Sequence, residues 1–364
     1  MAAPITNASA LNSDFVQSEV MKEMVYENTL FFLMGSTANS SIQMVSRPKK
    51  SGDTVRIPFL NQLNDSATLG SSQLQGNTED LSYVSDTVTI DYVRYGVKIE
   101  DLDLTEERAP FQIFNEARPL LVTAGAQHLR DHIIDELGDV SEGRSRNRYL
   151  YGAADANWNA THATALANID TTADKMTFEI IDEMKEKADL GGNTSGLAVS
   201  HRIRPYRQVM DNGAISNMYV LLLHPTAARQ LRADPLYQNI ALYRNEQNAP
   251  KLVDGSRYMG QYNGVLLYQL DELARLADNT AVYNGGYTRT DLTTAGASSS
   301  AVVHNLLLGA QAVAVVQGMM PRFDEEATDF KRNREVAFTE LRGVEKLVFN
   351  SVDNGVLHCF TSKG

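Results

Sequence analysis

The sequence is poor in cysteine and has no long apolar run. One cysteine, Cys359, stands among 364 residues, so no internal disulfide can form and a zinc site built from cysteines is excluded. No stretch approaches the roughly 18–20 continuous apolar residues that a membrane-spanning helix needs. The N-terminus lacks the basic flank and the apolar run of a secretory signal. We therefore expect an intracellular origin and no contact with a membrane.

Positive charge is also scarce. The chain has 33 Lys and Arg residues against 45 Asp and Glu, a formal net charge of −12. A protein that binds nucleic acid over its whole surface is normally basic, because it must neutralise phosphates. That class is excluded, and we interpret the basic clusters at 47–50 and 144–148 as solvated loop charges. An acidic protein can still enclose DNA without sequence-specific binding, since a container need not bind its contents.

Motifs that carry chemistry are few. No G-x-x-x-x-G-K-[ST] occurs and no G-x-G-x-x-G follows a strand, so the motifs that cradle phosphates are absent. His128 and His132 lie four residues apart, on one helix face, and H-x-x-D-H resembles the inverted zincin motif H-x-x-E-H. Asp131 has a shorter reach than Glu, however, and nothing marks a third ligand. We expect a polar stripe beside a buried face, with a metal-dependent hydrolase as the alternative.

Two further candidate catalytic residues, His224 and Cys359, are predicted to have structural roles. His224 precedes Pro225 where a strand meets a helix, and no G-x-S-x-G accompanies it, so we predict a turn rather than a catalytic base. Cys359 lies in a terminal strand and is predicted to be a small core residue rather than a nucleophile. The sequence therefore predicts no catalytic residue, no metal and no cofactor.

What the sequence does contain is apolar residues, 43% of the chain, enough for two domains or for one with a large insertion. Residues 1–15 are interpreted as a flexible arm. Residues 15–34 have a helical pattern that stops at Gly35 and Ser36. A ribbon follows.

The ribbon begins in "KKSGDTVRIPFL" at 49–60, where Val55, Ile57 and Phe59 alternate with polar residues. Pro58 cannot donate to a strand ladder, so this is an edge strand or a free ribbon. Residues 61–80 are interpreted as the distal turn. The chain returns with Val88, Ile90 and Tyr92 on one face, and the apolar phase then shifts to Val93, Tyr95, Val97 and Ile99. That one-residue shift predicts a β-bulge near Tyr92.

Two helices follow the ribbon. A long helix is expected over 105–138, with Pro119 kinking or dividing it. Its second half carries one apolar stripe, formed by Val122, Ala126, Leu129, Ile133 and Leu137. A second, amphipathic helix is expected from Thr177 to Leu190, ended by Gly191 and Gly192.

The rest of the chain alternates strands and helices. Strands are expected in "MYVLLL", "NGVLLYQL" and "AVVHNLLL", with a helix in "TAARQLRAD". Residues 334–347 alternate again, and Asn354-Gly355 predicts a hairpin turn.

This order of elements resembles the Hong Kong 97-type (HK97-like) major capsid proteins of tailed phages, most closely the capsid family of the N-four-like podoviruses. The segments that carry the resemblance run from about residue 45 to the end, namely "KKSGDTVRIPFL", "LQGNTEDLSYVSDTVTIDYVRYGVKIEDLDL", "YVLLLHPTAARQLRADP", "YNGVLLYQLDEL", "LLLGAQAVAV" and "RGVEKLVFN…DNGVLHCFTS". The implied fold class is α+β, with an N-terminal arm, an extended β-ribbon loop, a peripheral domain with a long spine helix, and an axial α/β domain.

The resemblance implies a division of the chain and a role for each part. The expected parts are an arm at 1–44, an extended loop at 45–98, a peripheral domain at 99–196 with the spine helix at 105–138, an axial domain at 197–318, and returning strands of the peripheral domain at 319–364. The extended loop would lie across a neighbouring subunit. The expected contact residues are Lys49, Lys50, Asp53, Arg56, Ile57, Phe59, Val88, Ile90 and Tyr92.

The function that the resemblance implies is structural and not enzymatic. Copies of the chain would assemble through pentamers and hexamers into an icosahedral phage head around double-stranded DNA, in the cytoplasm of a bacterial host. Portal, scaffold and decoration proteins are the further partners expected. An encapsulin-like nanocompartment shell, which shares the implied fold, is the alternative among assembly proteins, and its cargo would be protein.

Overall fold

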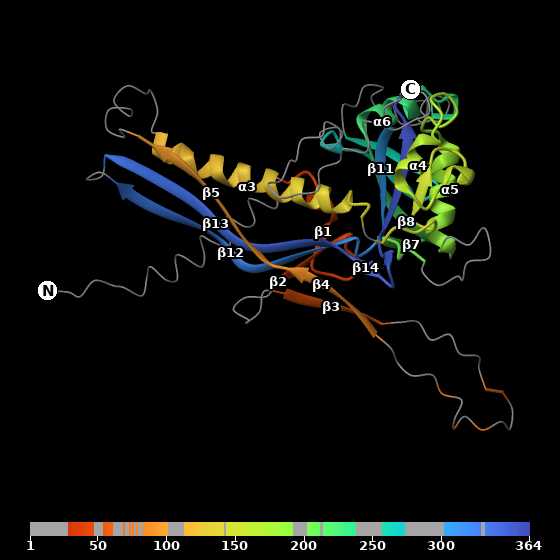
Figure 1. Ribbon diagram of the computed structural model, residues 1–364, viewed down its shortest axis with the longest axis horizontal. Helices are drawn as coiled ribbons and strands as arrows, with labels where there is room; N and C mark the ends of the chain where they lie inside the picture. The colour runs from red at the N-terminus through yellow and green to blue at the C-terminus, as the bar shows by residue number, and fades with distance from the viewer. Residues whose placement is uncertain are drawn as a thin grey trace.

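Two β-sheets, one elongated and one compact, make up the body of the protein (Figure 1). The computed structural model describes residues 28–46, 54–60, 83–100, 113–141, 143–191, 202–211, 214–237, 257–273, 302–328 and 332–364, with a few isolated positions between 68 and 78. Every structural statement below concerns these residues. The expected contact residues Lys49, Lys50 and Asp53, and the expected arm at 1–15, lie outside them.

The elongated sheet has five strands in the order β1-β2-β12-β13-β5. Their bounds are Met34–Gly35 for β1, Ile42–Ser46 for β2, Val313–Thr328 for β12, Asn333–Lys346 for β13 and Asp91–Ile99 for β5. The long antiparallel pair β12 and β13 lies in the middle of this sheet, and β2 runs parallel to β12. Helix α3, Ile113–Leu137, lies along one face (Figure 1).

The compact sheet has seven strands in the order β6-β16-β11-β8-β10-β9, with β7 beside β8. The strands are β6 (Tyr149–Tyr151), β7 (Arg207–Asp211), β8 (Ala214–Leu223), β9 (Tyr258–Tyr262), β10 (Val265–Gln269), β11 (Val302–Leu308) and β16 (Val356–Ser362). The helices around it are α4 (His162–Ala167), α5 (Phe178–Leu190) and α6 (Pro225–Ala233). Short 3-10 turns lie at Phe31–Leu33 and Asp155–Asn157.

The helices confirm most of the expectations from sequence. The apolar stripe of α3 is buried from Val122 to Leu137. Pro119 lies inside this helix without dividing it, and the predicted start at 105 lies outside the described residues. Helix α5 begins after Thr177 and ends at Gly191, whose φ of 71° is the left-handed conformation that favours glycine at a helix C-terminus.

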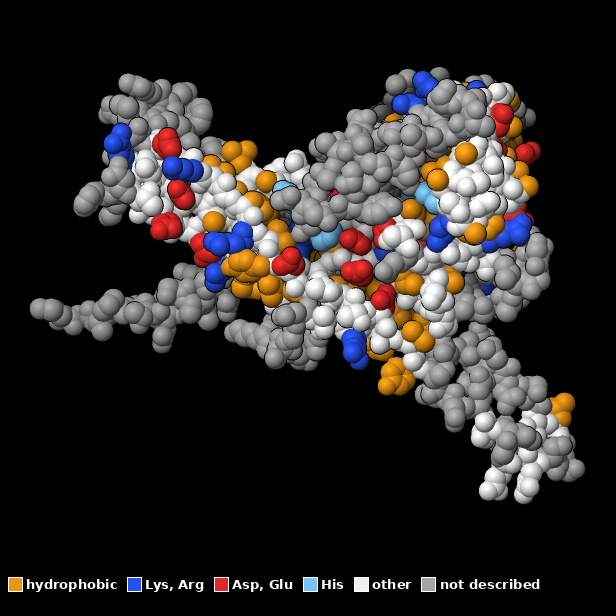
Figure 2. Space-filling model, viewed as in Figure 1, with side chains coloured by type: hydrophobic (Ala, Val, Ile, Leu, Met, Phe, Trp, Pro, Cys, Tyr) orange, Lys and Arg blue, Asp and Glu red, His pale blue; other side chains and the backbone are white. Residues whose placement is uncertain are grey.

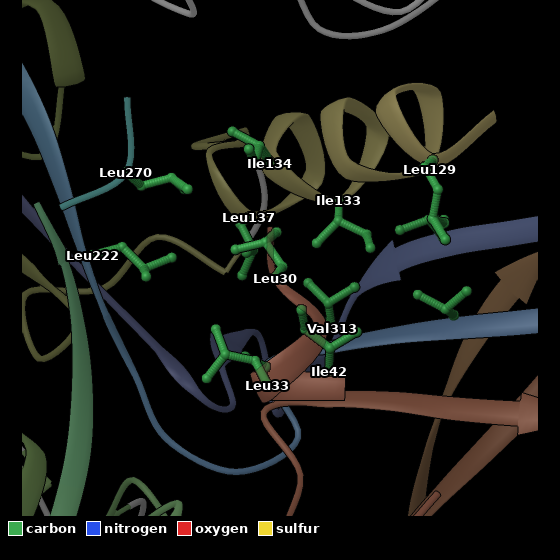
Figure 3. Packing of buried hydrophobic residues seen from close by; sticks show 14 of the residues in the cluster. Leu30, Leu33, Ile42, Leu129, Ile133, Ile134, Leu137, Leu222, Leu270 and Val313 are labelled. Carbon is green, nitrogen blue, oxygen red and sulfur yellow. The ribbon is translucent and has the colours of Figure 1, made fainter. Parts of the chain in front are cut away.

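One hydrophobic core joins the two sheets. The α3 residues Leu129, Ile133 and Leu137 point toward Val313 of β12, and residues of the compact lobe, among them Leu222, complete the cluster (Figure 3). Because both sheets contribute to this cluster, tilting one against the other would expose apolar side chains to water. None of the described helices is both long and apolar enough to span a bilayer.

Segments from different expected parts of the chain share the compact sheet. Strand β16, from the part expected at 319–364, pairs with β11 and β6, and helix α5, from the part expected at 99–196, packs in the same core as β8. The expected domain bounds stay predictions, because pairing between distant segments is not encoded in a local pattern. The predicted helix at 15–34 was wrong at its end, which is a 3-10 turn followed by strand β1.

Candidate functional site

The ribbon predicted from the sequence is present and projects from the body (Figure 1). It consists of β3, Thr54–Leu60, and β4, Tyr83–Thr89, paired antiparallel as a sheet of two strands. Val55 and Ile57 are buried while Arg56 and Pro58 are exposed, so the predicted alternation is confirmed. Pro58 accordingly stands on a strand that pairs on one side only.

The apolar face of the ribbon is covered by the subunit itself. Val55, Ile57 and Val88 pack against Ala314 and Val316 of β12 and against Leu347, with Phe59 and Ile90 partly buried at the margin. Side chains already covered in the monomer have little surface left to offer a neighbour. The apolar residues expected at the contact, Ile57, Phe59, Val88 and Ile90, are thus anchor residues of the ribbon within its own subunit, and their contact with a neighbouring subunit stays a prediction.

The shift of apolar phase after Ile90 has a different cause from the one predicted. Instead of a bulge, β4 ends at Thr89 and β5 begins at Asp91, where the chain leaves the ribbon and pairs with β13. Each strand keeps its own alternation, and the phase changes because the chain moves to another sheet. The paired strands of the ribbon, Thr54–Leu60 and Tyr83–Thr89, lie inside the expected extended loop at 45–98, whose bounds stay a prediction.

A small hairpin packs against the ribbon. It consists of β14, Val348–Phe349, and β15, Val352–Asp353. The ring of Phe59 meets that of Phe349 edge to face at 5.6 Å. The backbone N–H of Val348 donates a hydrogen bond of 2.7 Å to Oδ2 of Asp86. Sequence analysis missed Asp86, although it is the one charged residue in the inward phase of β4, between Val84 and Val88.

The ribbon crosses the elongated sheet at Gly343. A Cβ atom on this residue would lie 2.2 Å from the backbone oxygen of Thr89, far inside van der Waals contact. Strand β4 can pass this close to β13 only because Gly343 has no side chain. The crossing fixes where the ribbon leaves the body.

Buried charges join the two sheets at the C-terminal end of β13, next to this crossing. Asp353 forms an ion pair with Lys346, with Nζ 2.9 Å from Oδ1, and its Oδ2 lies 3.1 Å from His358 Nε2 within hydrogen-bond distance; all three side chains are buried. Arg148 Nε donates to the backbone oxygen of Asp353 at 2.7 Å. Burial by itself would raise the pKa of Asp353, but the bond from His358 and the charge of Lys346 lower it, so the carboxylate stays ionised.

Comparison with known proteins accounts for this architecture. A family model described as phage capsid protein matches residues 5–363. The chain belongs to the phage capsid protein family. No curated protein sequence matches it.

Solved phage capsids have the same fold. The capsid of cyanophage Pam1 superposes with a TM-score of 0.76 at 22% identity, covering 93% of both chains. The head of Helicobacter pylori bacteriophage KHP40 has a TM-score of 0.70 at 18% identity, covering 93% of this chain and 92% of the other. The capsid of Ralstonia phage GP4 has a TM-score of 0.67 at 21% identity, covering 91% and 89%. The HK97-like fold predicted from the sequence is thus confirmed.

In this capsid protein two of the expected contact residues face solvent. Arg56 is exposed on β3, and Tyr92 of β5 is 47% exposed, with the guanidinium of Arg94 at 5.6 Å from its ring centroid. A half-exposed tyrosine next to an arginine is a combination found at protein interfaces. Arg56 and Tyr92 therefore stay predictions for the contact with a neighbouring subunit.

The histidines considered for a metal site are packing residues. The His128 ring stacks on Tyr95, which stacks in turn on Phe338, with ring centroids 5.3 and 4.7 Å apart. His132 is mostly buried, and burial followed by the charge of Arg342 lowers its pKa to about 3. In the described part of the chain, no three His, Cys, Asp or Glu side chains gather as a metal would require.

The remaining candidates also have structural roles. His224 accepts a bond from the Thr226 N–H at 3.1 Å and so caps helix α6, which confirms the predicted turn. Cys359 is buried in β16, and burial raises the pKa of its thiol, as expected of a core residue.

Proposed function

We propose that this capsid protein assembles, through pentamers and hexamers, into an icosahedral head that encloses double-stranded DNA without reading its sequence. The observation that carries the proposal is the match of a phage capsid family model to residues 5–363. The charge of −12 suits a container that does not bind its contents tightly. The narrower resemblance to the N-four-like podovirus capsids stays a prediction.

Each layer of the subunit has a role in this proposal. The elongated sheet with α3 forms the peripheral part, the compact sheet forms the axial part at the centre of each capsomer, and the ribbon reaches a neighbouring subunit. Many weak contacts per subunit suffice, because they act together in a closed shell. Assembly takes place in the cytoplasm of the bacterial host, with portal, scaffold and decoration proteins as further partners.

The direct test is expression of the chain alone, followed by negative-stain electron microscopy and light scattering. Closed particles of some tens of nanometres, or capsomer rings, are expected. The nucleic-acid content of particles purified from infected cells then separates a phage head from an encapsulin-like compartment, which would hold protein. A monomer that stays soluble at every salt and protein concentration, with and without the other head proteins of the phage, would refute the proposal.

The role of the ribbon has its own test. Deletion of residues 62–80 should leave a folded subunit, because the anchor residues of the ribbon lie outside the deleted segment. Shells should then fail to form or should fall apart at lower denaturant. Shells as numerous and as stable as those of the intact chain would show that the ribbon does not hold neighbours together.

A further inference from the structure

Asp86 is a charged residue in a position where the strand pattern requires an apolar one. It pairs across the ribbon with Ile57, so both side chains lie on the face that turns toward the body. Its neighbours in the same phase are Val84, partly buried, and Val88, fully buried. A carboxylate in such a place is unfavourable unless hydrogen bonds replace the water it loses.

Two backbone N–H groups donate hydrogen bonds to the Asp86 carboxylate. The N–H of Thr87 donates to Oδ1 at 2.8 Å, and the N–H of Val348 donates to Oδ2 at 2.7 Å. The first bond is local, but the second joins residues 262 positions apart in the chain. Bonds to an ionised acceptor are shorter and stronger than bonds between neutral groups. Asp86 therefore ties the middle of β4 to the first residue of the hairpin.

The hairpin is a firm support for this bond. Its second strand ends at Asp353, which is held by Lys346 and His358. The next residue, Asn354, donates its N–H to Leu347 O at 3.0 Å and its side chain to Gln311 O at 3.1 Å. The hairpin is thus fixed to the junction of the two sheets, while the ribbon rests on it.

We propose that Asp86 is a positioning residue that sets the direction in which the ribbon leaves the subunit, with the hairpin Val348–Asp353 as its support. This inference rests on the proposed function, since direction matters only if the ribbon reaches a neighbour. Gly343 fixes the point at which β4 crosses β13, and Asp86 fixes the angle between the ribbon and the body. Strands β3 and β4 are paired from Thr54 to Leu60, so a change of angle at Asp86 turns both strands together.

A matched control exists on the adjoining strand. Asp91 accepts a bond of 2.6 Å from the N–H of Tyr92, the same local geometry as Asp86 and Thr87. It begins β5, which pairs with β13 rather than with the hairpin. Asp91→Ala therefore removes the local bond and one negative charge, whereas Asp86→Ala also removes the bond to Val348.

The test measures direction and assembly separately. Spin labels at Ser85→Cys and Met320→Cys, both exposed, report the distance between ribbon and body by pulsed electron paramagnetic resonance. Asp86→Ala should broaden this distance distribution at least twofold and speed hydrogen exchange at the Val348 amide at least tenfold. The fraction of subunits in shells, measured by sedimentation, should fall at least tenfold. Asp91→Ala should match the wild type in all three, and both variants should melt within about 3 °C of each other, the shift expected of one exposed bond.

The outcomes separate this inference from the function on which it rests. An unchanged distance distribution in Asp86→Ala, or a broadened one with normal assembly, would overturn the positioning role while leaving the capsid function intact. An equal loss of assembly in Asp91→Ala would assign the effect to charge rather than to the hairpin bond and would also overturn it. If the wild type itself forms no shell, the proposed function fails, and the distance and exchange measurements still decide whether Asp86 holds the ribbon.

Discussion

The ribbon and the junction of the two sheets are attached to the same strand, β13, in opposite ways. At the junction, a continuous core from both sheets surrounds the buried charges of Lys346, Asp353 and His358. At the ribbon, three buried side chains, one aromatic contact and the bond that Val348 donates to Asp86 make the attachment, beside a crossing that only a glycine permits.

This difference separates two tasks within one subunit. Burying apolar surface is non-directional and grows with area, so a large shared core resists any tilt between the sheets. A narrow attachment with one directional hydrogen bond fixes an angle but resists little force. We infer that the body behaves as one rigid unit and that adjustment between neighbouring subunits falls on the ribbon. In the surface view, the described side chains of the two sheets form one continuous body (Figure 2).

The largest expected effect comes from breaking the charge cluster at the junction. Asp353→Ala leaves Lys346 buried without the carboxylate with which it pairs, which should lower the free energy of unfolding by about 3–5 kcal/mol. Chemical denaturation of the unassembled subunit measures this loss. Glu100→Ala is the control, because its pair with Lys98 has side chains 70% and 51% exposed and should be worth less than about 1 kcal/mol. Equal losses would contradict a rigid junction.

The pH dependence of the same variant follows from the lowered pKa of Asp353. A carboxyl whose pKa is lower in the folded than in the unfolded state contributes stability above its ordinary value, 3.8. That contribution is lost as pH falls through the folded-state pKa. The difference in stability between wild type and Asp353→Ala should therefore be constant above about pH 5 and shrink in stronger acid.

The ribbon should respond more weakly and more locally. Ile57→Ala removes a buried side chain from a small cluster that can partly collapse, so we expect a loss of about 2 kcal/mol, at the low end for such a change. Hydrogen exchange should rise in β3 and β4 and stay unchanged in β16. Arg56→Ala, at the next and exposed position, should change stability by less than about 0.5 kcal/mol. Faster exchange throughout the compact sheet would mean that the ribbon and the body unfold together.

Glu136, near the end of α3, gives a pH test of the same junction. Burial, and then the charges of Glu345 and Asp139, raise the pKa of Glu136 from its ordinary value of 4.5 to about 8. The folded protein thus keeps a proton that the unfolded chain releases, and this contribution, fully present below pH 4.5, is lost as pH rises to about 8. Glu136→Gln has no proton to lose.

The expected result is a variant as stable as the wild type at pH 4.5 and more stable at pH 8. Each unit by which the pKa of Glu136 is raised corresponds to about 1.4 kcal/mol of stability. We therefore expect the free energy of unfolding of Glu136→Gln at pH 8 to exceed that of the wild type by more than this amount. Glu326→Gln, at an exposed position, serves as the control and should show no gain. Equal curves for the wild type and Glu136→Gln would show that the Glu136 carboxyl is as solvated in the folded subunit as in the unfolded chain.

Much of the fold follows from local pattern. The alternation of Val55 and Ile57, the apolar stripe of α3 and the Thr177 to Gly191 boundaries of α5 are all confirmed. Each depends on residues a few positions apart, which set which face is buried. The partners of each strand depend on distant segments instead. Strand β2 pairs with β12 across some 270 residues, and its short sequence "IQMVS" gave no strand prediction.

The candidate site was harder to predict than the fold. A sequence shows that a ribbon has an apolar face, but not whether the same chain or a neighbour covers it. In the monomer, Ile57 and Val88 pack against Ala314, Val316 and Leu347 of the same chain. Charges such as Asp86 and Asp353 look solvated in sequence, and only distant groups show that Asp353 is buried and that Asp86, partly buried, is bonded to Val348. The alternation of β4 could have revealed Asp86, because it places this acidic residue on the inward face between Val84 and Val88, where a carboxylate needs a hydrogen-bond partner.

The hairpin that supports the ribbon offers the smallest predicted effect and also corrects the turn prediction. Its turn is not at Asn354-Gly355 but at Asn350 and Ser351, with φ values of 49° and 61°. Gly355 is a glycine for another reason, because a Cβ there would lie 2.4 Å from the backbone oxygen of Ala310.

Serine adopts the left-handed conformation at a cost that glycine avoids, and Asn-Gly is the preferred pair for such a two-residue turn. Ser351→Gly should therefore raise the free energy of unfolding by about 0.5–1 kcal/mol, and Ser351→Ala should give no gain. If the hairpin supports the ribbon, hydrogen exchange at the Val348 amide should also slow in Ser351→Gly. A stabilised hairpin with unchanged exchange at Val348 would mean that the bond to Asp86, rather than the turn, limits how firmly the ribbon is held.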